Sequence, residues 1–336
     1  MLIKKIFVCE FITAGGFNDT DLPVGLVAEA ELMRDALLRD LSDLHYLIHT
    51  TIDTRLNAPK KCQSCVAIEA NDNAWSIWTD QMQQADAVWI IAPEANGMLL
   101  KLTELAMLLD RPILGCGVHS VKTTSEKLAT YFMLQQAGIK TIPTYTLNNW
   151  PKTDGEKNNG KWLAKPNDGA GCDETVLFDD VDGLANWLEQ NHKKESHVIQ
   201  PYQKGIPASI SCVMHQGQAQ VLSCNRQMIS IENNKLSFAG SQVNDMRDFW
   251  PEFELLAQKI ALTDTDLTGY VGIDVIVNTQ KDNEITVVEI NPRLTTSYAG
   301  LAEATGENPA ELIISTLTQP HFVWPVLQRN VVNIHV

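Results

Sequence analysis

Apolar and polar positions in the first 115 residues follow two alternating patterns: short apolar runs, and longer segments whose apolar residues recur every three or four positions. The short runs predict strands at Ile3–Cys9, Leu44–Ile48, Ala87–Ile91 and Pro112–Leu114. The first longer segment predicts a helix whose apolar face consists of Leu26, Ala30, Met33, Leu37 and Leu41. Further helices are expected over Ala74–Gln84 and Met98–Leu109. Strands and helices that alternate in this order are typical of a parallel α/β sheet.

The pattern changes beyond residue 115. A helix is expected over Ser125–Gln136, and a polar segment rich in Gly and Asn at 148–160 is expected to be a loop. A small α+β block follows, with expected elements at Lys161–Lys165, Thr175–Phe178, Val181–Gln190 and His197–Gln200. The rest is richer in strands, at Ser209–His215, Ala219–Gln227, Tyr270–Val277 and Ile285–Ile290, with helices at Pro251–Ala261 and Glu307–Leu317. We therefore divide the chain into units 1–115, 116–198 and 199–336.

The composition is that of a globular protein, with 44% hydrophobic and 20% charged residues. Forty-one acidic residues against 26 basic ones give a formal net charge of −15. A surface this negative repels phosphate backbones and anionic lipids, which argues against nucleic acid and membranes as partners. The start of the chain resembles a strand rather than a signal peptide. Together with seven cysteines, an odd number, this predicts a cytoplasmic protein with reduced thiols.

The pair Cys62-x-x-Cys65 has two interpretations. A structural zinc site needs a second pair of ligands at suitable spacing, and the nearest histidines, His45 and His49, fall in an expected strand and its flank. We interpret the cysteines as two ordinary thiols in a surface loop, and keep a metal site as the alternative.

Two lysines occur in contexts that suit phosphate binding. Lys165 ends an apolar strand and enters a turn with Gly169 and Gly171, where successive backbone N–H groups are able to converge on an anion. A Gly-x-Gly turn alone is usually a hairpin, so the preceding lysine is what favours a phosphate site. Lys127 lies at the start of the helix expected after Ser125. Alone, it would be interpreted as a solvated charge.

The segment from Val198 to Gly205 reads as a short strand that opens into an extended crossover. Backbone groups on such a crossover are able to hydrogen-bond the edge of a purine base. The residues concerned are Gln200, Pro201, Tyr202 and Gln203. A plain hinge between two domains is the competing interpretation.

Three oxygen-bearing side chains form the strongest pattern. Val271, Ile273, Val275 and Val277 are expected to share one face of a strand, which places Asp274 on the other. On the next strand, we expect Ile285, Val287, Glu289 and Asn291 to share a face. A turn centred between Lys281 and Asp282 pairs Asp274 with Glu289. Converging carboxylate and amide oxygens suit Mg²⁺ that carries substrate phosphates. The alternative is an exposed polar hairpin face.

The order of these motifs resembles the ATP-grasp superfamily of carboxylate–amine ligases. The resemblance covers about residues 116–318 and rests on Ser125-Glu126-Lys127, Lys165 to Gly171, Gln200 to Gly205, Asp274 and Glu289-Ile-Asn291-Pro-Arg293. Glu10 to Gly16, Ala92-Pro-Glu94 and Asn291 to Ser297 look most like the tyramine–glutamate ligases of methanofuran biosynthesis. The resemblance implies an N-terminal parallel α/β (pre-ATP-grasp) domain, a small lid subdomain and a C-terminal α+β domain with an antiparallel sheet.

The resemblance also implies a reaction, in which ATP phosphorylates a carboxylate and an amine attacks the resulting acylphosphate. Lys127, Lys165 and the turn Gly169-Ala170-Gly171 would bind phosphates, while Asp274, Glu289 and Asn291 would hold Mg²⁺ or Mn²⁺. Arg293 and Lys165 are the expected catalytic residues. The expected substrate residues are Glu10, Gly15, Gly16, Glu94, Arg247 and Ser297, although Gly15 and Gly16 equally suit a plain turn and Arg247 a surface salt bridge. The expected partners are a small carboxylate, a small amine and a second copy of the chain.

One departure from the family pattern affects nucleotide binding. Many ATP-grasp enzymes carry a glutamate after the hinge that accepts the ribose hydroxyls, whereas this chain has Pro207 in the matching region. Two alternatives therefore stay open. The first is a catalytically inactive ATP-binding regulatory protein of the same fold. The second is a dehydrogenase-like dinucleotide domain in the N-terminal half.

Overall fold

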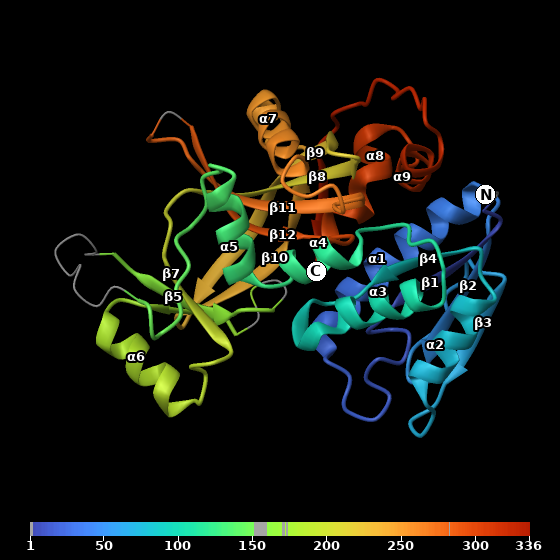
Figure 1. The fold of residues 1–336 in the computed structure, drawn as a ribbon, viewed down its shortest axis with the longest axis horizontal. Coiled ribbons are helices and arrows are strands. Elements are labelled where there is room, and N and C mark those ends of the chain that lie inside the picture. The colour runs from blue at the N-terminus through green and yellow to red at the C-terminus, as the bar shows by residue number, and fades with distance from the viewer. Residues whose placement is uncertain (1–2, 151–159, 170–171, 173, 282) are drawn as a thin grey trace.

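The computed structural model describes residues 3–150, 160–169, 172, 174–281 and 283–336. The N-terminal domain contains the expected parallel sheet, with strand order β3-β2-β1-β4. Its strands are β1 (Lys5–Glu10), β2 (Leu47–Asp53), β3 (Ser64–Ile68) and β4 (Ala87–Ile91). Its helices are α1 (Val24–Asp43), α2 (Ala74–Gln83) and α3 (Met98–Leu108). In Figure 1 this domain lies at the lower right.

Three sequence predictions in this domain need correction. Strand β2 covers Leu47–Asp53, so it overlaps the strand expected at Leu44–Ile48 only at Leu47 and Ile48. Pro112–Leu114 forms no strand and contributes only a parallel bridge between Val88 and Ile113. Strand β3 was not predicted, because as an edge strand it buries only Ile68 fully. Cys65 lies within β3, so only Cys62 belongs to the loop in which both cysteines were expected.

The carboxyl ends of the parallel strands place two acidic residues at one edge of the sheet. Glu10 is the last residue of β1, and Glu94 follows β4 by three positions. The two strands are direct neighbours, paired from Ile6–Ala87 to Glu10–Ile91. Ligands bind at this edge in open α/β sheets.

Two short helices, α4 (Val118–Thr124) and α5 (Lys127–Gln136), connect the domains. The expected helix begins at Lys127 rather than Ser125, and Glu126 at the break between α4 and α5 has an extended backbone. Asn167 fixes the start of α5, because its carbonyl accepts from Lys127 N at 2.8 Å and its Oδ1 from Leu128 N at 3.0 Å. The first turn of α5 is therefore bound to the loop that follows Lys165.

The small subdomain has the predicted order of elements. It contains β5 (Trp162–Pro166), β6 (Val176–Phe178), α6 (Val181–Gln190) and β7 (His197–Pro201). Trp150, Trp162, Leu184 and Leu188 form its separate hydrophobic core. Asp180 caps α6 by accepting from Gly183 N at 2.6 Å. The loop expected at 148–160 lies largely outside the described residues, since 151–159 are not described.

The larger sheet has the strand order β12-β11-β8-β9-β10-β6-β5-β7, with β13 paired to β10. Its C-terminal strands are β8 (Ile206–His215), β9 (Gln218–Glu232), β10 (Lys235–Val243), β11 (Gly269–Asn278), β12 (Glu284–Asn291) and β13 (Val332–His335). The helices of this domain are α7 (Trp250–Ala261), α8 (Leu301–Thr305) and α9 (Pro309–Thr318). Figure 1 shows these elements above the parallel sheet, with the small subdomain at the lower left.

These C-terminal strands pair antiparallel, as expected. Strands β10 and β13 were not predicted, because polar and apolar residues mix along both. The unit boundary expected at 198/199 falls inside β7. None of the described helices is long and apolar enough to cross a membrane.

Candidate active site

A cavity of about 1230 Å³ lies where the parallel sheet, the small subdomain and the antiparallel sheet meet. Each unit contributes to its wall. The expected site residues that line it are Glu10, Gly169, Asp274, Glu289, Asn291, Arg293 and Ser297. Residues separated by more than 260 positions in the sequence therefore surround one space.

The acidic pair forms as predicted, through a local geometry that was not. Asp274 on β11 is paired with Glu289 on β12, but a β-bulge follows, and Val275 is paired with Val287. Val288 is the extra residue. Because paired residues project to the same face, Val287 lies on the apolar face with Val275, and Glu289 lies on the opposite face with Asp274. The expectation that Ile285 and Val287 share a face with Glu289 was therefore wrong.

Amide groups hold both oxygens of the Asp274 carboxylate. Gln227 Nε2 donates to Oδ1 at 2.9 Å, and Asn291 Nδ2 donates to Oδ2 at 3.3 Å. Burial raises the pKa of Asp274 well above its usual range, and the neighbouring Glu289 carboxylate raises it further. A cation bound here would remove this penalty on the ionised form.

Glu289 is the more readily ionised member of the pair. Burial alone would raise the pKa of Glu289, but the charges of Lys127 and Lys165 outweigh it and lower the pKa below its usual value. Lys127 Nζ lies 3.5 Å from Glu289 Oε2. The pKa values of the two acidic residues are thus shifted in opposite directions, because the two lysines lower that of Glu289 and the Glu289 charge raises that of Asp274.

The two lysines are buried at the base of the small subdomain. Lys127 Nζ donates to the carbonyl of Gly169 at 2.6 Å, which ties α5 to the glycine turn. Desolvation lowers the pKa of Lys165, against the attraction of Glu289. Two buried ammonium groups close together form a suitable site for a polyanion such as a triphosphate. Ala170 and Gly171 lie outside the described residues.

The donor set fits a hard divalent cation. Asp274, Glu289 and Asn291 offer two carboxylates and an amide oxygen from adjacent strands, and phosphate oxygens are the usual remaining ligands of Mg²⁺. Within the described part of the chain, no group of three or more His, Cys, Asp or Glu side chains is arranged to hold a metal ion by itself. The cysteines at 62 and 65 therefore lack the further ligands that a structural zinc site requires.

Arg293 and Glu94 form a buried ion pair across the domain boundary. Arg293 Nε and Nη2 donate to the two carboxylate oxygens of Glu94, each at 2.9 Å, and Nη1 donates to the Leu294 carbonyl at 3.0 Å. Their side chains are 10% and 5% exposed, respectively. Such a bidentate pair fixes the plane of the guanidinium. An expected catalytic residue, Arg293, and an expected substrate residue, Glu94, therefore contact each other.

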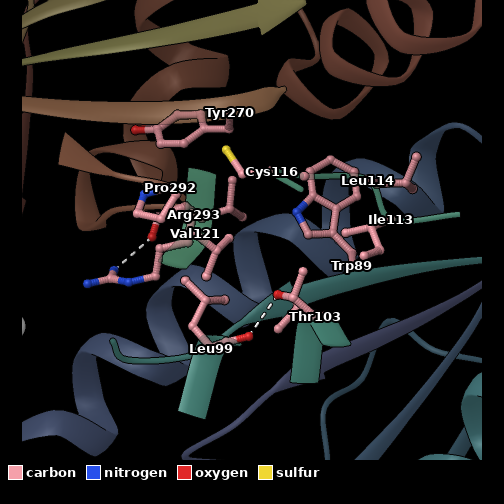
Figure 2. A pocket seen from close by; sticks show the side chains of 13 residues that line it. Trp89, Leu99, Thr103, Ile113, Leu114, Cys116, Val121, Tyr270, Pro292 and Arg293 are labelled. Carbon is pink, nitrogen blue, oxygen red and sulfur yellow. Dashed lines mark hydrogen bonds between the residues drawn. The ribbon is translucent and has the colours of Figure 1, made fainter. Parts of the chain in front are cut away.

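Behind Arg293, side chains from both domains close the seam between the sheets. Figure 2 shows Trp89, Ile113 and Leu114 facing Tyr270 and Pro292. The space between them is only about 10 Å³, no larger than one water molecule requires. A space of this size is too small for a substrate.

The remaining N-terminal candidates separate into two groups. Glu10 lines the cavity while accepting from Thr13 N and Thr13 Oγ1, both at 2.7 Å, and burial raises its pKa. Gly15 and Gly16 do not line the cavity. Gly15 has a φ of +92°, and a Cβ there would collide with the side chain of Ile68. A Cβ on Gly16 would lie 2.4 Å from the carbonyl of Phe11. The glycines accordingly serve the turn, which was the alternative interpretation.

Two C-terminal candidates also differ. Ser297, in the short helix η3 (Thr296–Gly300), is buried, lines the cavity and contacts Ser241 at 3.1 Å through its hydroxyl. Arg247, in η2 (Arg247–Phe249), does not line the cavity and donates to the carbonyl of Arg329 at 3.4 Å. Its expected role in substrate binding has no geometric support.

The hinge segment lies beside the cavity rather than in its wall. Gln200 is buried, and its Nε2 donates to Thr144 Oγ1 at 2.8 Å. Its Oε1 is a buried acceptor with no hydrogen-bond partner among the described residues. The N–H of Tyr202 already donates to the carbonyl of Lys161 at 2.7 Å, so it is not free for a base. Pro201 ends β7, and Gln203 follows it without regular structure.

Sequence reasoning missed several polar residues around Asp274. Ser209 and Gln227 line the cavity, and Asn225 donates to Ser209 and Ser211 at 3.3 and 3.1 Å. A signal for them existed. Small polar residues alternate with other residues at positions 209 and 211, and again at 223, 225 and 227, which predicts a polar strand face.

Comparison with protein families gives two matches. The model of an ATP-grasp domain matches residues 124–297, just over half of the 336 residues. The model of a pre ATP-grasp 3 domain matches residues 46–121. The second match ends where the first helix of the linker ends, within three residues.

Similar proteins cover nearly the whole chain. A tyramine–L-glutamate ligase from Methanocaldococcus fervens is 28% identical over 326 residues, which span 96% of this chain and 97% of the relative. The crystal structure of an ATP-grasp superfamily protein from Archaeoglobus fulgidus has a TM-score of 0.71 at 21% identity, covering 99% of both chains. The biotin carboxylase domain of Hydrogenobacter thermophilus 2-oxoglutarate carboxylase, solved with MgADP, has a TM-score of 0.73 at 13% identity, covering 98% of this chain and 73% of that one.

Proposed function

Because the chain belongs to the ATP-grasp family of ATP-dependent carbon–nitrogen ligases, we propose that it forms an amide bond between a small carboxylate and an amine through an acylphosphate. The observation that carries this proposal is that Asp274, Glu289 and Asn291 line the cavity while the buried Lys127 and Lys165 act on Glu289. It combines a site for a divalent cation with two ammonium groups for phosphates. Enzymes of this family use ATP and Mg²⁺.

In the first step, a substrate carboxylate oxygen attacks the γ-phosphorus of ATP and ADP leaves. Lys127 and Lys165 neutralise charge on the phosphates, and Lys127 keeps the Gly169 turn in place through its carbonyl. Asp274, Glu289 and Asn291 would hold Mg²⁺, which when bound would supply positive charge for the phosphates. The sites of metal and phosphate meet at Glu289, the residue that contacts Lys127.

In the second step, the neutral amine nitrogen attacks the acyl carbon, inorganic phosphate leaves, and the nitrogen passes a proton to the departing phosphate as the amide forms. Of the five N–H groups of Arg293, three donate to Glu94 and Leu294 among the described residues, which leaves two for the acylphosphate. Water must be excluded, since an acylphosphate hydrolyses. Asp168 supports closure, because its Oδ2 accepts from Asn96 N at 2.9 Å across the domains.

The proposed substrates are glutamate and an aromatic amine, and the proposed pathway is the synthesis of a methanofuran-like one-carbon coenzyme. The similarity to a tyramine–L-glutamate ligase supports this choice. We further propose that two copies of the chain associate and that Mn²⁺ is able to replace Mg²⁺. The set of ligands and lysines is complete, which favours a ligase over an inactive regulatory protein despite Pro207.

The test is the release of ADP when Mg-ATP and glutamate are mixed with tyramine, followed by screening of other acids and amines. We expect Glu289→Ala and Lys165→Ala to abolish ADP formation while circular dichroism stays unchanged. Lys161→Ala is the matched control, because Lys161 lies immediately before β5, the strand of Lys165, is 49% exposed and pairs with Asp179 on the surface. Full turnover in either active-site variant would rule out the proposed mechanism.

A further inference from the structure

Helix α1 presents an acidic residue on a mostly apolar wall of the cavity. Leu26, Ala30 and Met33 line the cavity, and Glu29 lines it between them, one turn after Leu26 and one turn before Met33. Leu26 is 38% exposed, although it belongs to the apolar face of the helix. An apolar side chain that is left open inside a cavity is a surface for a ligand to cover.

Glu29 is a carboxylate without a cation partner. In the described chain, the ion pairs of α1 join Arg34 and Arg39 to other acidic residues of the helix, and none includes Glu29. Its carboxylate accepts from Thr296 Oγ1 of the C-terminal domain. Its charge also acts on Arg293. Glu29 therefore belongs to the N-terminal domain and faces the C-terminal domain next to Arg293.

Arg293 does not neutralise this carboxylate, because its guanidinium is paired with Glu94. A ligand that suits this wall needs a positive group for Glu29 and an apolar body for Leu26 and Met33. A primary amine with an aryl or alkyl chain has both. A dicarboxylic amino acid suits it less well, because it has no apolar chain for Leu26 and Met33 and Glu29 repels its two carboxylates.

We propose that α1 forms the amine subsite, with Glu29 binding the substrate ammonium and Leu26, Ala30 and Met33 covering its apolar chain. This inference rests on the proposed function, and it adds the residues that choose the amine. Gly25 completes the wall: it lines the cavity, and a Cβ there would meet nothing within 4 Å. A larger side chain at this position would enter the amine subsite without backbone strain.

The experiment measures steady-state kinetics with tyramine and with methylamine, which shares the ammonium but lacks the apolar chain. We expect Glu29→Gln to raise the KM for both amines about tenfold or more, while the KM values for ATP and the acid change less than twofold. Glu31→Gln is the matched control, because Glu31 lies on the same helix and faces Arg34 at 3.8 Å. It should leave all constants unchanged.

Steric variants test the apolar part separately. Leu26→Ala and Gly25→Leu should raise the KM for tyramine about fivefold or more and leave that for methylamine unchanged. Leucine also favours the helix over glycine, so Gly25→Leu should not lower the melting temperature. If Glu29→Gln and both steric variants keep the wild-type KM values, the amine binds elsewhere and the inference is wrong, even if the protein is an active ligase.

Equilibrium binding separates this inference from the proposed function. Calorimetric titration of tyramine into the full chain with Mg-ADP should show binding that Glu29→Gln weakens about tenfold and Glu31→Gln does not. If no acid–amine pair releases ADP, the proposed function fails, and this titration still decides the subsite. Equal binding to all three proteins, or no binding to the wild type, overturns the assignment of α1.

Discussion

Lys165, Glu289 and Asp274 show how single residues acquire their properties from the sites into which the fold brings them. Desolvation disfavours the charged form of each, so it lowers the pKa of the lysine and raises that of an acid. Glu289 escapes this effect because two ammonium groups lie beside it, and Asp274 does not because its nearest charge is Glu289. A polyphosphate would therefore stabilise the charged form of Lys165, and a divalent cation would stabilise that of Asp274, both of which burial disfavours.

Lys165 gives a prediction on pH. Because burial lowers its pKa, Lys165 loses its proton at a lower pH than an exposed lysine does. Only the protonated form attracts a triphosphate, so we expect nucleotide affinity to fall before the pH reaches the usual lysine pKa of about 10.4. Fluorescent-nucleotide binding over a series of pH values measures the effect. In Lys165→Arg the side chain stays charged, so binding should be weaker but independent of pH. A parallel fall in both proteins would exclude Lys165 as the titrating group.

The ion pair of Glu94 and Arg293 gives a prediction on stability. Removing one partner leaves the other charge buried, so Glu94→Ala should lower the free energy of unfolding by about 3 kcal/mol. Asp179→Ala breaks an exposed pair with Lys161 and should cost less than ~1 kcal/mol. Glu94→Leu combined with Arg293→Met should recover most of the loss, at the expense of activity. Urea unfolding measures all three, and equal costs for Glu94→Ala and Asp179→Ala would contradict the role of the buried pair.

At the scale of elements, periodicity predicted most strands and helices but not the details on which the site depends. Alternation along Val271–Val277 placed Asp274 correctly, because β11 is regular. The same rule failed on β12, since the bulge at Val288 reverses which residues face the cavity. A bulge leaves no trace in a pattern of apolar residues such as Val287-Val288. The predicted register of the hairpin, in which Asp274 is paired with Glu289, is correct only at the end nearest the site.

The contact of Glu94 with Arg293 was beyond sequence reasoning for a different reason. The sequence indicates each residue separately, because Glu94 follows a parallel strand and Arg293 follows the metal-ligand motif. Their sequence separation of 199 positions is bridged only by the docking of two domains. The polar residues at 209, 225 and 227 were accessible from alternation, as was the acidic position 29 within an apolar face. Spacing predicted the residue types, and packing determined which of them meet.

The loop after β5 gives a prediction about closure. Asp168 binds the backbone of Asn96, in the short helix η1 (Ala95–Gly97), and thereby joins the small subdomain to the parallel sheet. We expect Asp168→Ala to open this side of the cavity, so that ADP forms without a matching amount of amide. Glu195→Ala is a suitable control, because Glu195 is exposed on the same subdomain. The ratio of ADP to amide is the measurement, and a ratio of one in Asp168→Ala would show that this contact does not exclude water.

On the scale of the whole molecule, a net charge of −15 is compatible with a nucleotide site only if the positive groups are local. The structure buries Lys127 and Lys165 beside Glu289, a carboxylate that lines the cavity together with Asp274. The lysines attract a free triphosphate but the two carboxylates repel it. Mg-ATP carries a cation that these carboxylates are able to bind. Binding of ATP should therefore depend on Mg²⁺ far more than the lysines alone would require.

Thermal unfolding tests this balance. A ligand that binds only the folded state raises the free energy of unfolding by RT ln(1 + [L]/Kd), which is ~2.7 kcal/mol at a hundredfold excess over Kd. For a chain of 336 residues, this shift amounts to a few degrees.

We expect Mg-ATP to raise the melting temperature in this way, while ATP with EDTA, Mg²⁺ alone and NAD leave it unchanged. In Glu289→Ala, ATP with and without Mg²⁺ should have equal effects, because the variant lacks both the metal ligand and one of the repelling charges. Stabilisation by NAD would instead indicate a dinucleotide site in the N-terminal domain, and a gain from ATP with EDTA as large as from Mg-ATP would mean that the acidic pair does not face the phosphates.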